Sequence, residues 1–350
     1  MDNRDWLIEN ASIPIRYILT QDLSLKDSLL DNDDVKLWLS KLSDRVADNN
    51  LADIHGSHDY RYENIIGKCF ILGLNKNILE FDSSVKFFID FLNQQINKVF
   101  DEKLTFGKMY QYRDYETIIS CYMPFLGYGK EPCVEYVAKK RINIVYDFAK
   151  QKRYDIYCKD MKYPGAIKSW IPYILDPELY KDGNISVPSI HDFILFAGIY
   201  PYLEQDMKQK VETIVKWLLD EKYSQLISSY YYYAPYDPSY KSKHINNKVT
   251  LLNLDTPNFQ DNELLYQCFI FSHFEEIRKC EWFSRVLFYL DQYKTENGRF
   301  VFPRSMIDEK ADTYVYKSSH MNVGESKRNK NYAEIISTYW MNRIEQNCRI

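Results

Sequence analysis

The chain has 350 residues, of which 45% are hydrophobic and 27% charged, and its formal net charge is -4. This composition excludes a disordered or fibrous protein, and the charge offers no general attraction for nucleic acid or an anionic membrane. Because one hydrophobic core stops growing at roughly 250–300 residues, the chain folds as two domains or as stacked repeats.

Two residue types carry further information. The 31 Tyr and 19 Phe suit a wide, partly wet internal surface, although an A/T-rich coding bias explains them equally well. The seven Cys are scattered without a C-x-x-C pair, as is typical of reduced cytosolic thiols. The start of the chain lacks an apolar leader, and the run Phe193–Tyr200 is far shorter than the ~20 residues of a membrane span. We therefore expect a cytoplasmic protein without a membrane span.

The first 50 residues predict short helices. Apolar residues from Trp6 and again from Ile13 indicate two of them, with Ser12 placed to cap the second and Pro14 in its first turn. The acid run Asp31–Asp34 precedes a further apolar helix. Carboxylates at that position satisfy free N–H groups and the positive end of the helix dipole.

From residue 51 onward a helical hairpin recurs. Each leading helix is almost wholly apolar and each following helix is amphipathic, so burial favours the leading helices inside and the following ones outside. An acid in the first turn marks each leading helix, at nearly constant spacing in the later copies: Glu63, Glu116, Asp192, Glu263 and Glu334. We predict an all-α fold in which residues 1–350 form a single α/α-toroid domain. This barrel has about five to six helical hairpins, and residues 1–50 lead into the ring.

Two segments between the hairpins, 156–188 and 230–257, show little periodicity. Long loops in a compact fold are usually lids or binding loops. The Tyr-rich stretch 228–238 is the extreme case, and inert packing explains it equally well.

The end of the chain predicts a helix, a Thr295–Gly298 turn, an extended piece Arg299–Pro303 and a last helix Asn331–Arg343. The spacing of Gln292, Gly298 and Phe300 is similar to the Q-x(2–5)-G-x-W turn of the terpenoid cyclase and protein prenyltransferase α/α-toroid superfamily, with Phe for Trp. The opening residues 6–17 and the closing residues 298–340 resemble a bacterial prenyltransferase-like, or squalene-cyclase-like, branch that has no assigned reaction. The resemblance implies the toroid fold and an apolar or isoprenoid-like ligand.

The chemistry of that superfamily finds little support in the residues. Asp31–Asp34 matches the D-x-D-D acid motif of class II cyclases, but helix capping explains it without catalysis. The D-x-C zinc pattern and the D-D-x-x-D magnesium pattern are absent from the sequence. We therefore expect no metal and no cofactor.

The densest polar cluster spans residues 55–63. His58 and Asp59 are candidates for acid/base catalysis, and His55, Tyr62 and Glu63 for binding a ligand at the mouth of the cavity. The alternative is a loop whose acids lie near a helix N-terminus.

Further candidates lie at the starts of other leading helices and at the end of the chain. A rim of carboxylates would favour a cationic or polyhydroxy ligand, but complementing the helix dipoles also explains it. Likewise, the loop of His320 and Glu325 either faces the cavity or locks the first and last helices together. These additional ligand-binding candidates are Tyr115, Glu116, His191, Asp192, His320, Glu325 and Trp340.

Two functions remain open. The first is a binding protein or enzyme of unassigned reaction that holds an apolar or isoprenoid-like small molecule in an aromatic cavity. It predicts that His58, Asp59, Tyr62, His191 and Glu325 converge on one pocket. The second is a non-catalytic protein-interaction scaffold whose centre is filled by its own side chains, with Tyr230–Tyr240 as the plug.

Overall fold

The computed structural model describes residues 2–48, 53–97, 114–226, 229–233, 241–247, 249–255 and 261–349. Helices dominate these ranges and strands are few, which confirms the all-α prediction. The chain divides into two compact units. Unit 1 comprises Met1–Ile89, Tyr122–Gly129 and Leu252–Ile350, and unit 2 comprises Asp90–Cys121 and Lys130–Leu251. The single domain and the closed ring stay predictions.

Unit 1 begins with the predicted N-terminal helices. Pro14 lies in the first turn of the second helix, as expected. Ser12 occupies the cap position, but its hydroxyl donates to the Val323 carbonyl at 3.2 Å instead of capping the helix. Ser12 therefore takes the predicted N-cap position but lacks the predicted capping bond, because its hydroxyl is directed at an oxygen from the far end of the chain. The elements are α1 (Asn3–Asn10), α2 (Ile13–Thr20), η1 (Leu23–Leu25), α3 (Lys26–Asp31) and α4 (Asp33–Ala47).

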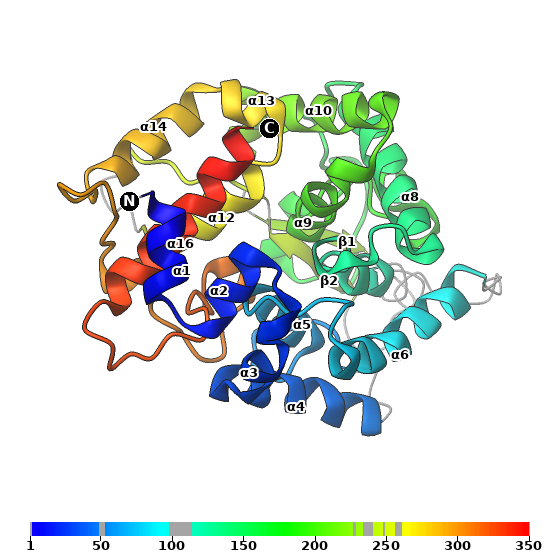
Figure 1. The fold of residues 1–350 in the computed structure, drawn as a ribbon. Coiled ribbons are helices and arrows are strands. Elements are labelled where there is room, and N and C mark those ends of the chain that lie inside the picture. Colours follow the sequence, from blue (N-terminus) through cyan, green and yellow to red (C-terminus); the bar gives the residue numbers. More distant parts are fainter. Residues whose placement is uncertain are drawn as a thin grey trace. The chain divides into compact units, whose positions relative to one another are not determined.

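The hairpins of unit 1 follow the predicted burial. Every residue of the leading helix α5 (Tyr62–Ile71) is buried, and the amphipathic α6 (Leu79–Ile96) follows it. In the next hairpin, η6 (Asp261–Glu263) and the apolar α12 (Leu264–Phe271) precede α13 (Glu275–Lys279) and α14 (Glu281–Asp291). The last helix, α16 (Tyr332–Cys348), extends beyond the predicted Arg343. It lies against both α1 and α12 (Figure 1), so the two ends of the chain meet in unit 1.

The predicted turn between α14 and the end of the chain is confirmed. The Thr295 amide donates to the Arg299 carbonyl at 2.7 Å, and Gly298 takes a left-handed φ of +80°. The extended piece after the turn is tied to α16, because the Phe300 amide donates to the Thr338 hydroxyl at 3.0 Å. The helical turns α15 (Arg304–Ile307) and η7 (Val315–Lys317) follow.

Unit 2 contains helical residues 114–120 and the helices α8 (Pro132–Ala149), α9 (Ile190–Ile199) and α10 (Gln205–Leu219). The leading helix α9 is buried at all but its first residue, and α8 contacts both α9 and α10. Ser189 and Asp192 form a capping box at the start of α9. The shorter elements η5 (Tyr200–Tyr202) and α11 (Glu221–Ser224) flank α10.

The two long segments are more ordered than predicted. Segment 156–188 contains η3 (Lys168–Tyr173) and η4 (Pro177–Gly183), and β1 (Ser229–Tyr233) pairs antiparallel with β2 (Ser242–Asn247). Tyr230 and Tyr232 are buried, while Tyr231 stacks on Trp170 with ring centroids 4.5 Å apart. Because Tyr occupies consecutive positions of β1, the sequence lacks the alternation of apolar and polar residues that predicts a strand. Residues 228 and 234–238 of the Tyr-rich stretch lie outside the described residues, as do residues 239 and 240 of the predicted plug.

Candidate functional site

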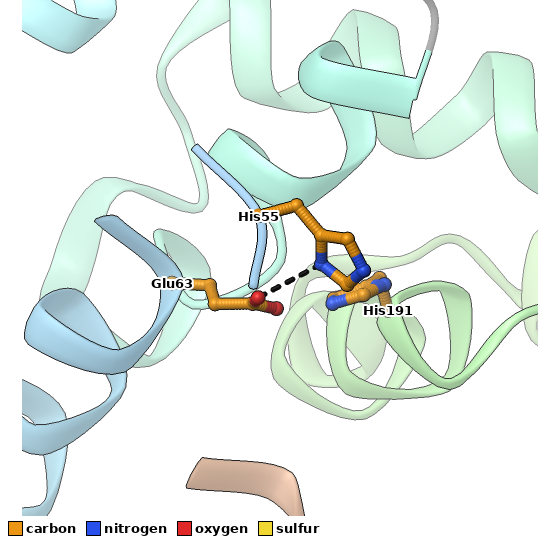
Figure 2. A group of neighbouring side chains, drawn as sticks. All are labelled: His55, Glu63 and His191. Carbon is orange, nitrogen blue, oxygen red and sulfur yellow. Dashed lines mark ion pairs between the residues drawn. The ribbon is translucent and has the colours of Figure 1, made fainter. Parts of the chain in front are cut away.

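The cluster at residues 55–63 forms a loop organised by the first turn of α5. Glu63 is buried; its carboxylate lies 2.8 Å from His55 Nδ1 and accepts the Gly56 amide at 2.7 Å. Figure 2 shows the His55 ring directed at that carboxylate. Asn64 donates to the carbonyl of His58 at 2.9 Å. These bonds favour the interpretation of a loop anchored at a helix N-terminus. The neighbouring candidate Tyr62 is buried against Phe88, with ring centroids 4.3 Å apart.

The two predicted catalytic residues have different surroundings. Asp59 Oδ1 accepts the Asp312 amide at 3.0 Å and lies 3.4 Å from Nε2 of the buried His320. Burial raises the pKa of Asp59, but the hydrogen bond and charge of His320 and the Asp312 amide outweigh it and lower that pKa. Asp59 is therefore a carboxylate at neutral pH and does not serve as a proton donor. His58 is exposed, with Nε2 3.6 Å from the Asp312 carboxylate.

A buried lysine that the sequence analysis missed lies beside this group. The fully buried Lys68 Nζ contacts the Glu309 carboxylate and donates to the Asn322 carbonyl at 2.6 Å. Burial raises the pKa of Glu309, but the charge and hydrogen bond of Lys68 outweigh it and lower that pKa. Glu309 is therefore a carboxylate at neutral pH. Because the Lys68 ammonium donates to oxygens of Glu309 and Asn322, it anchors the C-terminal loop to α5.

The loop of residues 320–325 holds the N-terminal helices. One oxygen of Glu325 accepts the Ser12 amide at 2.8 Å, and the other accepts from Asn329 Nδ2 at 3.0 Å. Asn32 Nδ2 donates to the Gly324 carbonyl at 3.1 Å. Trp340, another predicted binding residue, is buried and donates from its indole to the Met321 carbonyl at 2.9 Å. These contacts favour the interpretation that this loop locks the first and last helices together over the alternative that it faces a cavity.

The acid run Asp31–Asp34 leads into the N-terminus of helix α4. The Asn32 side chain accepts the amides of Asp34 and Val35 at 3.1 and 3.3 Å, so it caps α4, and Asp33 and Asp34 fall in the first turn. Burial raises the pKa of Asp34, against the opposing charge of Lys68. The capping interpretation of Asp31–Asp34 is confirmed.

The two predicted acids of unit 2, Glu116 and Asp192, pair with cations of helix α8. Lys140 Nζ lies 2.7 Å from the buried Glu116 carboxylate, and Arg141 binds both oxygens of the buried Asp192 at 2.7 and 2.9 Å. His191 is buried at the second position of α9, and Tyr115 is half-buried. In unit 1, Glu334 lies 2.7 Å from Arg299 and Glu263 lies 4.0 Å from Lys317. Four of the five acids therefore face a Lys or Arg and Glu63 contacts His55, which argues against a rim that awaits a cationic ligand.

A cavity of about 400 Å³ lies elsewhere in unit 1, away from the predicted site residues. It is formed where α2 and α5 end, beside the π-turn η2 (Pro124–Tyr128) and the last turns of α16. Phe70 and Phe125 line it with ring centroids 4.9 Å apart. The other lining residues are Ile18, Leu19, Gln21, Gly73, Leu74, Asn75, Lys76, Asn77, Gly127, Arg343 and Gln346.

Two glycines shape the walls of this cavity. Gly73 has a φ of +81°, and a β-carbon there would lie 2.5 Å from Ile18 Cγ1. Gly127 has a φ of +93°, and a β-carbon there would lie 3.1 Å from Lys76 Cγ. Because left-handed backbone favours glycine, both turns need this residue type. Glycine at the end of an apolar helix is visible in the sequence, but by itself it predicts only a helix end.

An aromatic and cationic layer backs the cavity. The Arg343 guanidinium lies 5.1 Å from the centroid of Phe269 and 5.9 Å from that of Phe70. His273 packs edge-on against Phe125 and Phe269, and its Nδ1 lies 3.0 Å from the Phe269 carbonyl. Burial lowers the pKa of His273 to about 4. In the sequence, Arg343 was visible only as the single basic residue of the predicted last helix, Asn331–Arg343.

No known protein family, curated protein or solved structure matches this chain. None of the helices in the described ranges combines the length and the apolar character needed to cross a bilayer.

Proposed function

We propose that the protein binds a small molecule with an apolar part in the cavity of unit 1. The observation that carries this proposal is the aromatic wall. Phe70 and Phe125 pack on each other with ring centroids 4.9 Å apart, and the centroid of Phe269 lies 6.0 Å from that of Phe70. A cavity of about 400 Å³ falls in the range of small-molecule sites, which is about 300–1,000 Å³. Such sites combine apolar walls with a few polar groups.

The α/α toroid and an isoprenoid-like ligand belong to the same proposal. The hairpins support the toroid, since the leading helices α5, α9 and α12 are buried nearly throughout and their partners α6, α10 and α14 are amphipathic. The resemblance of the Gln292–Phe300 turn to that of terpenoid cyclases supports an isoprenoid-like ligand.

The proposal is binding without an assigned reaction. The carboxylates predicted to line a reactive mouth are engaged by groups of the same unit: Glu63 by His55, Glu325 by Ser12, and Asp192 by Arg141. The lowered pKa of Asp59 removes the expected proton donor.

Mass spectrometry of small molecules extracted from the natively purified protein tests the proposal. We expect a bound apolar compound in the native chain and its loss in Phe125→Ala, which removes one face of the wall. Phe288→Ala is the matched control, because this side chain is 84% exposed and does not line the cavity. An extract without any compound, or equal retention by both variants, would contradict the proposal. That result is also what the scaffold alternative predicts.

A further inference from the structure

The charged side chains that line the cavity are all positive. Lys76 and Arg343 are its two cationic residues, and the described lining residues include no acid. Four amide side chains complete the polar lining: Gln21, Asn75, Asn77 and Gln346. Among the described residues, Arg343 has no carboxylate within ion-pair distance, unlike Arg299, Arg141 and Lys140.

Arg343 is held in place by aromatic contacts. Its Nη1 donates to the Tyr339 hydroxyl at 2.9 Å, and its guanidinium lies over the rings of Phe269 and Phe70. A guanidinium has five N–H donors in a fixed fork. One donor is used on the tyrosine, which leaves a side of the fork for a ligand. Cation–π contacts position the group without neutralising its charge.

The surrounding helix ends oppose a highly charged ligand. The cavity lies at the C-terminal ends of α2 and α5, where the helix dipole is negative. Local amides use part of this potential, since the amides of Gln21 and Gly73 donate to carbonyls of the last turns at 2.7 and 3.0 Å. A helix end carries about half an elementary charge. Two full cations therefore outweigh these helix ends, together with that of α16, for a monoanion, whereas a second negative charge meets little further attraction.

We propose that the ligand of this cavity is a planar aromatic monocarboxylate, whose carboxylate binds the fork of Arg343 and whose ring packs against the wall that Phe70 and Phe125 form. Arg343 matches a carboxylate because both are planar and can form two parallel hydrogen bonds. Lys76 adds a second charge from the opposite turn, where its stem lies on Gly127. This inference rests on the proposed function, because it assigns a ligand class to the same cavity. It replaces the isoprenoid-like ligand that the resemblance implies by an aromatic one.

Three matched probes test it by ligand-observed NMR at millimolar concentration. These are 2-naphthoate, the neutral 2-naphthamide and the dianionic 2-naphthyl phosphate, which share one ring system. We expect 2-naphthoate to bind at least tenfold more tightly than the other two. Arg343→Gln should reduce its affinity at least tenfold, and Arg343→Lys, which keeps the charge but loses the fork, should reduce it less.

Arg349→Gln is the control, because Arg349 directly follows α16 but does not line the cavity. Lys76→Gln should weaken 2-naphthoate several-fold, and it provides a second test if the Arg343 variants do not fold. Equal binding of 2-naphthamide, or full affinity in Arg343→Gln and Lys76→Gln, would overturn the carboxylate inference and leave the proposed function standing. Tightest binding of 2-naphthyl phosphate would replace the monocarboxylate by a phosphate ester. Binding of none of the three would overturn the inference, whereas the proposed function is decided separately by the extracted compound.

Discussion

Arg141 and Asp192 show how single residues hold unit 2 together. The two side chains form a buried, two-fold hydrogen-bonded ion pair, and the same carboxylate accepts the Ser189 amide at 2.8 Å. Removing one partner of a buried pair typically costs about 3–5 kcal/mol, because the other charge is left unpaired. We therefore expect Arg141→Met to lower the free energy of unfolding by about that amount in urea titrations.

A matched control lies two residues earlier on the same helix. Lys139 pairs with Glu135 at 2.6 Å, but both side chains are about half exposed. Exposed pairs contribute only about 0–1 kcal/mol. Lys139→Met should therefore change stability little, and equal losses in the two variants would refute a special role for the buried pair.

His273 predicts a stability change with pH. Burial lowers its pKa to about 4, whereas a histidine in the unfolded chain titrates near 6.5. Between these values the unfolded chain binds the extra proton, so stability is fully present above pH ~6.5 and falls as the pH drops toward 4. The size of this effect is on the order of 2–3 kcal/mol.

The variant His273→Gln removes this titration. Its urea-unfolding free energy should change less between pH 7.5 and pH 5 than that of the native chain. A direct measurement is the ring chemical shift of His273 followed against pH by NMR. A midpoint near 6.5 would show that the ring is not held in its neutral form by burial.

At the scale of elements, two glycines with nearly equal φ angles distinguish the free-energy cost of a left-handed backbone from the cost of overpacking. Gly73 and Gly298 have φ values of +81° and +80°, but a β-carbon meets Ile18 at 2.5 Å in the first case and nothing within 4 Å in the second. Gly298→Ala should cost about 1–2 kcal/mol for the left-handed backbone alone. Gly73→Ala should cost a further 1–3 kcal/mol or so, because it overpacks the junction of α2 and α5.

Thermal and urea unfolding of the two variants measure this difference. Because Gly73 also lines the cavity, Gly73→Ala should weaken binding of 2-naphthoate, while Gly298→Ala should leave it unchanged. Equal destabilisation by both substitutions would mean that α2 moves aside without cost.

Most elements could be predicted because their signals are local. The apolar pattern of the sequence sufficed to predict the helices α5, α9 and α12, and the residue types of Thr295–Gly298 sufficed to predict the turn. The β1–β2 ribbon could not be predicted from a run of tyrosines, since its pairing depends on the partner strand β2. The Ser12 cap failed for a related reason: its competitor, the Val323 carbonyl, is distant in sequence.

The candidate site was harder to predict than the elements. The residues singled out by charge near leading helices turned out to be paired, because a buried carboxylate needs a partner and the fold supplies one. The cavity instead collects residues from four separate stretches, including Gly73, Phe125 and Arg343. None of these stretches carries a recognisable motif alone. The polar side chains mattered through their tertiary neighbours, which one sequence does not show.

At the scale of the whole molecule, unit 1 is assembled from three separate stretches of chain. Glu325 joins the first and the last of them, since it accepts the amide of Ser12 at 2.8 Å. Lys68 makes a second junction through the Asn322 carbonyl. Breaking the first junction should therefore loosen both ends of the chain together.

Hydrogen exchange followed by mass spectrometry tests this coupling with Glu325→Ala. A buried acceptor that serves the Ser12 amide and Asn329 is lost, which costs about 1–3 kcal/mol for the groups left unsatisfied. We expect faster exchange in α1, α2 and the loop 320–325, although about 300 residues separate them in sequence, while α8 and α10 of unit 2 keep their protection. Exchange that rises in the loop alone would show that Glu325 only orders its own neighbourhood. An equal rise in unit 2 would mean that the two units unfold as one cooperative body, because local opening reports the boundaries of cooperative structure.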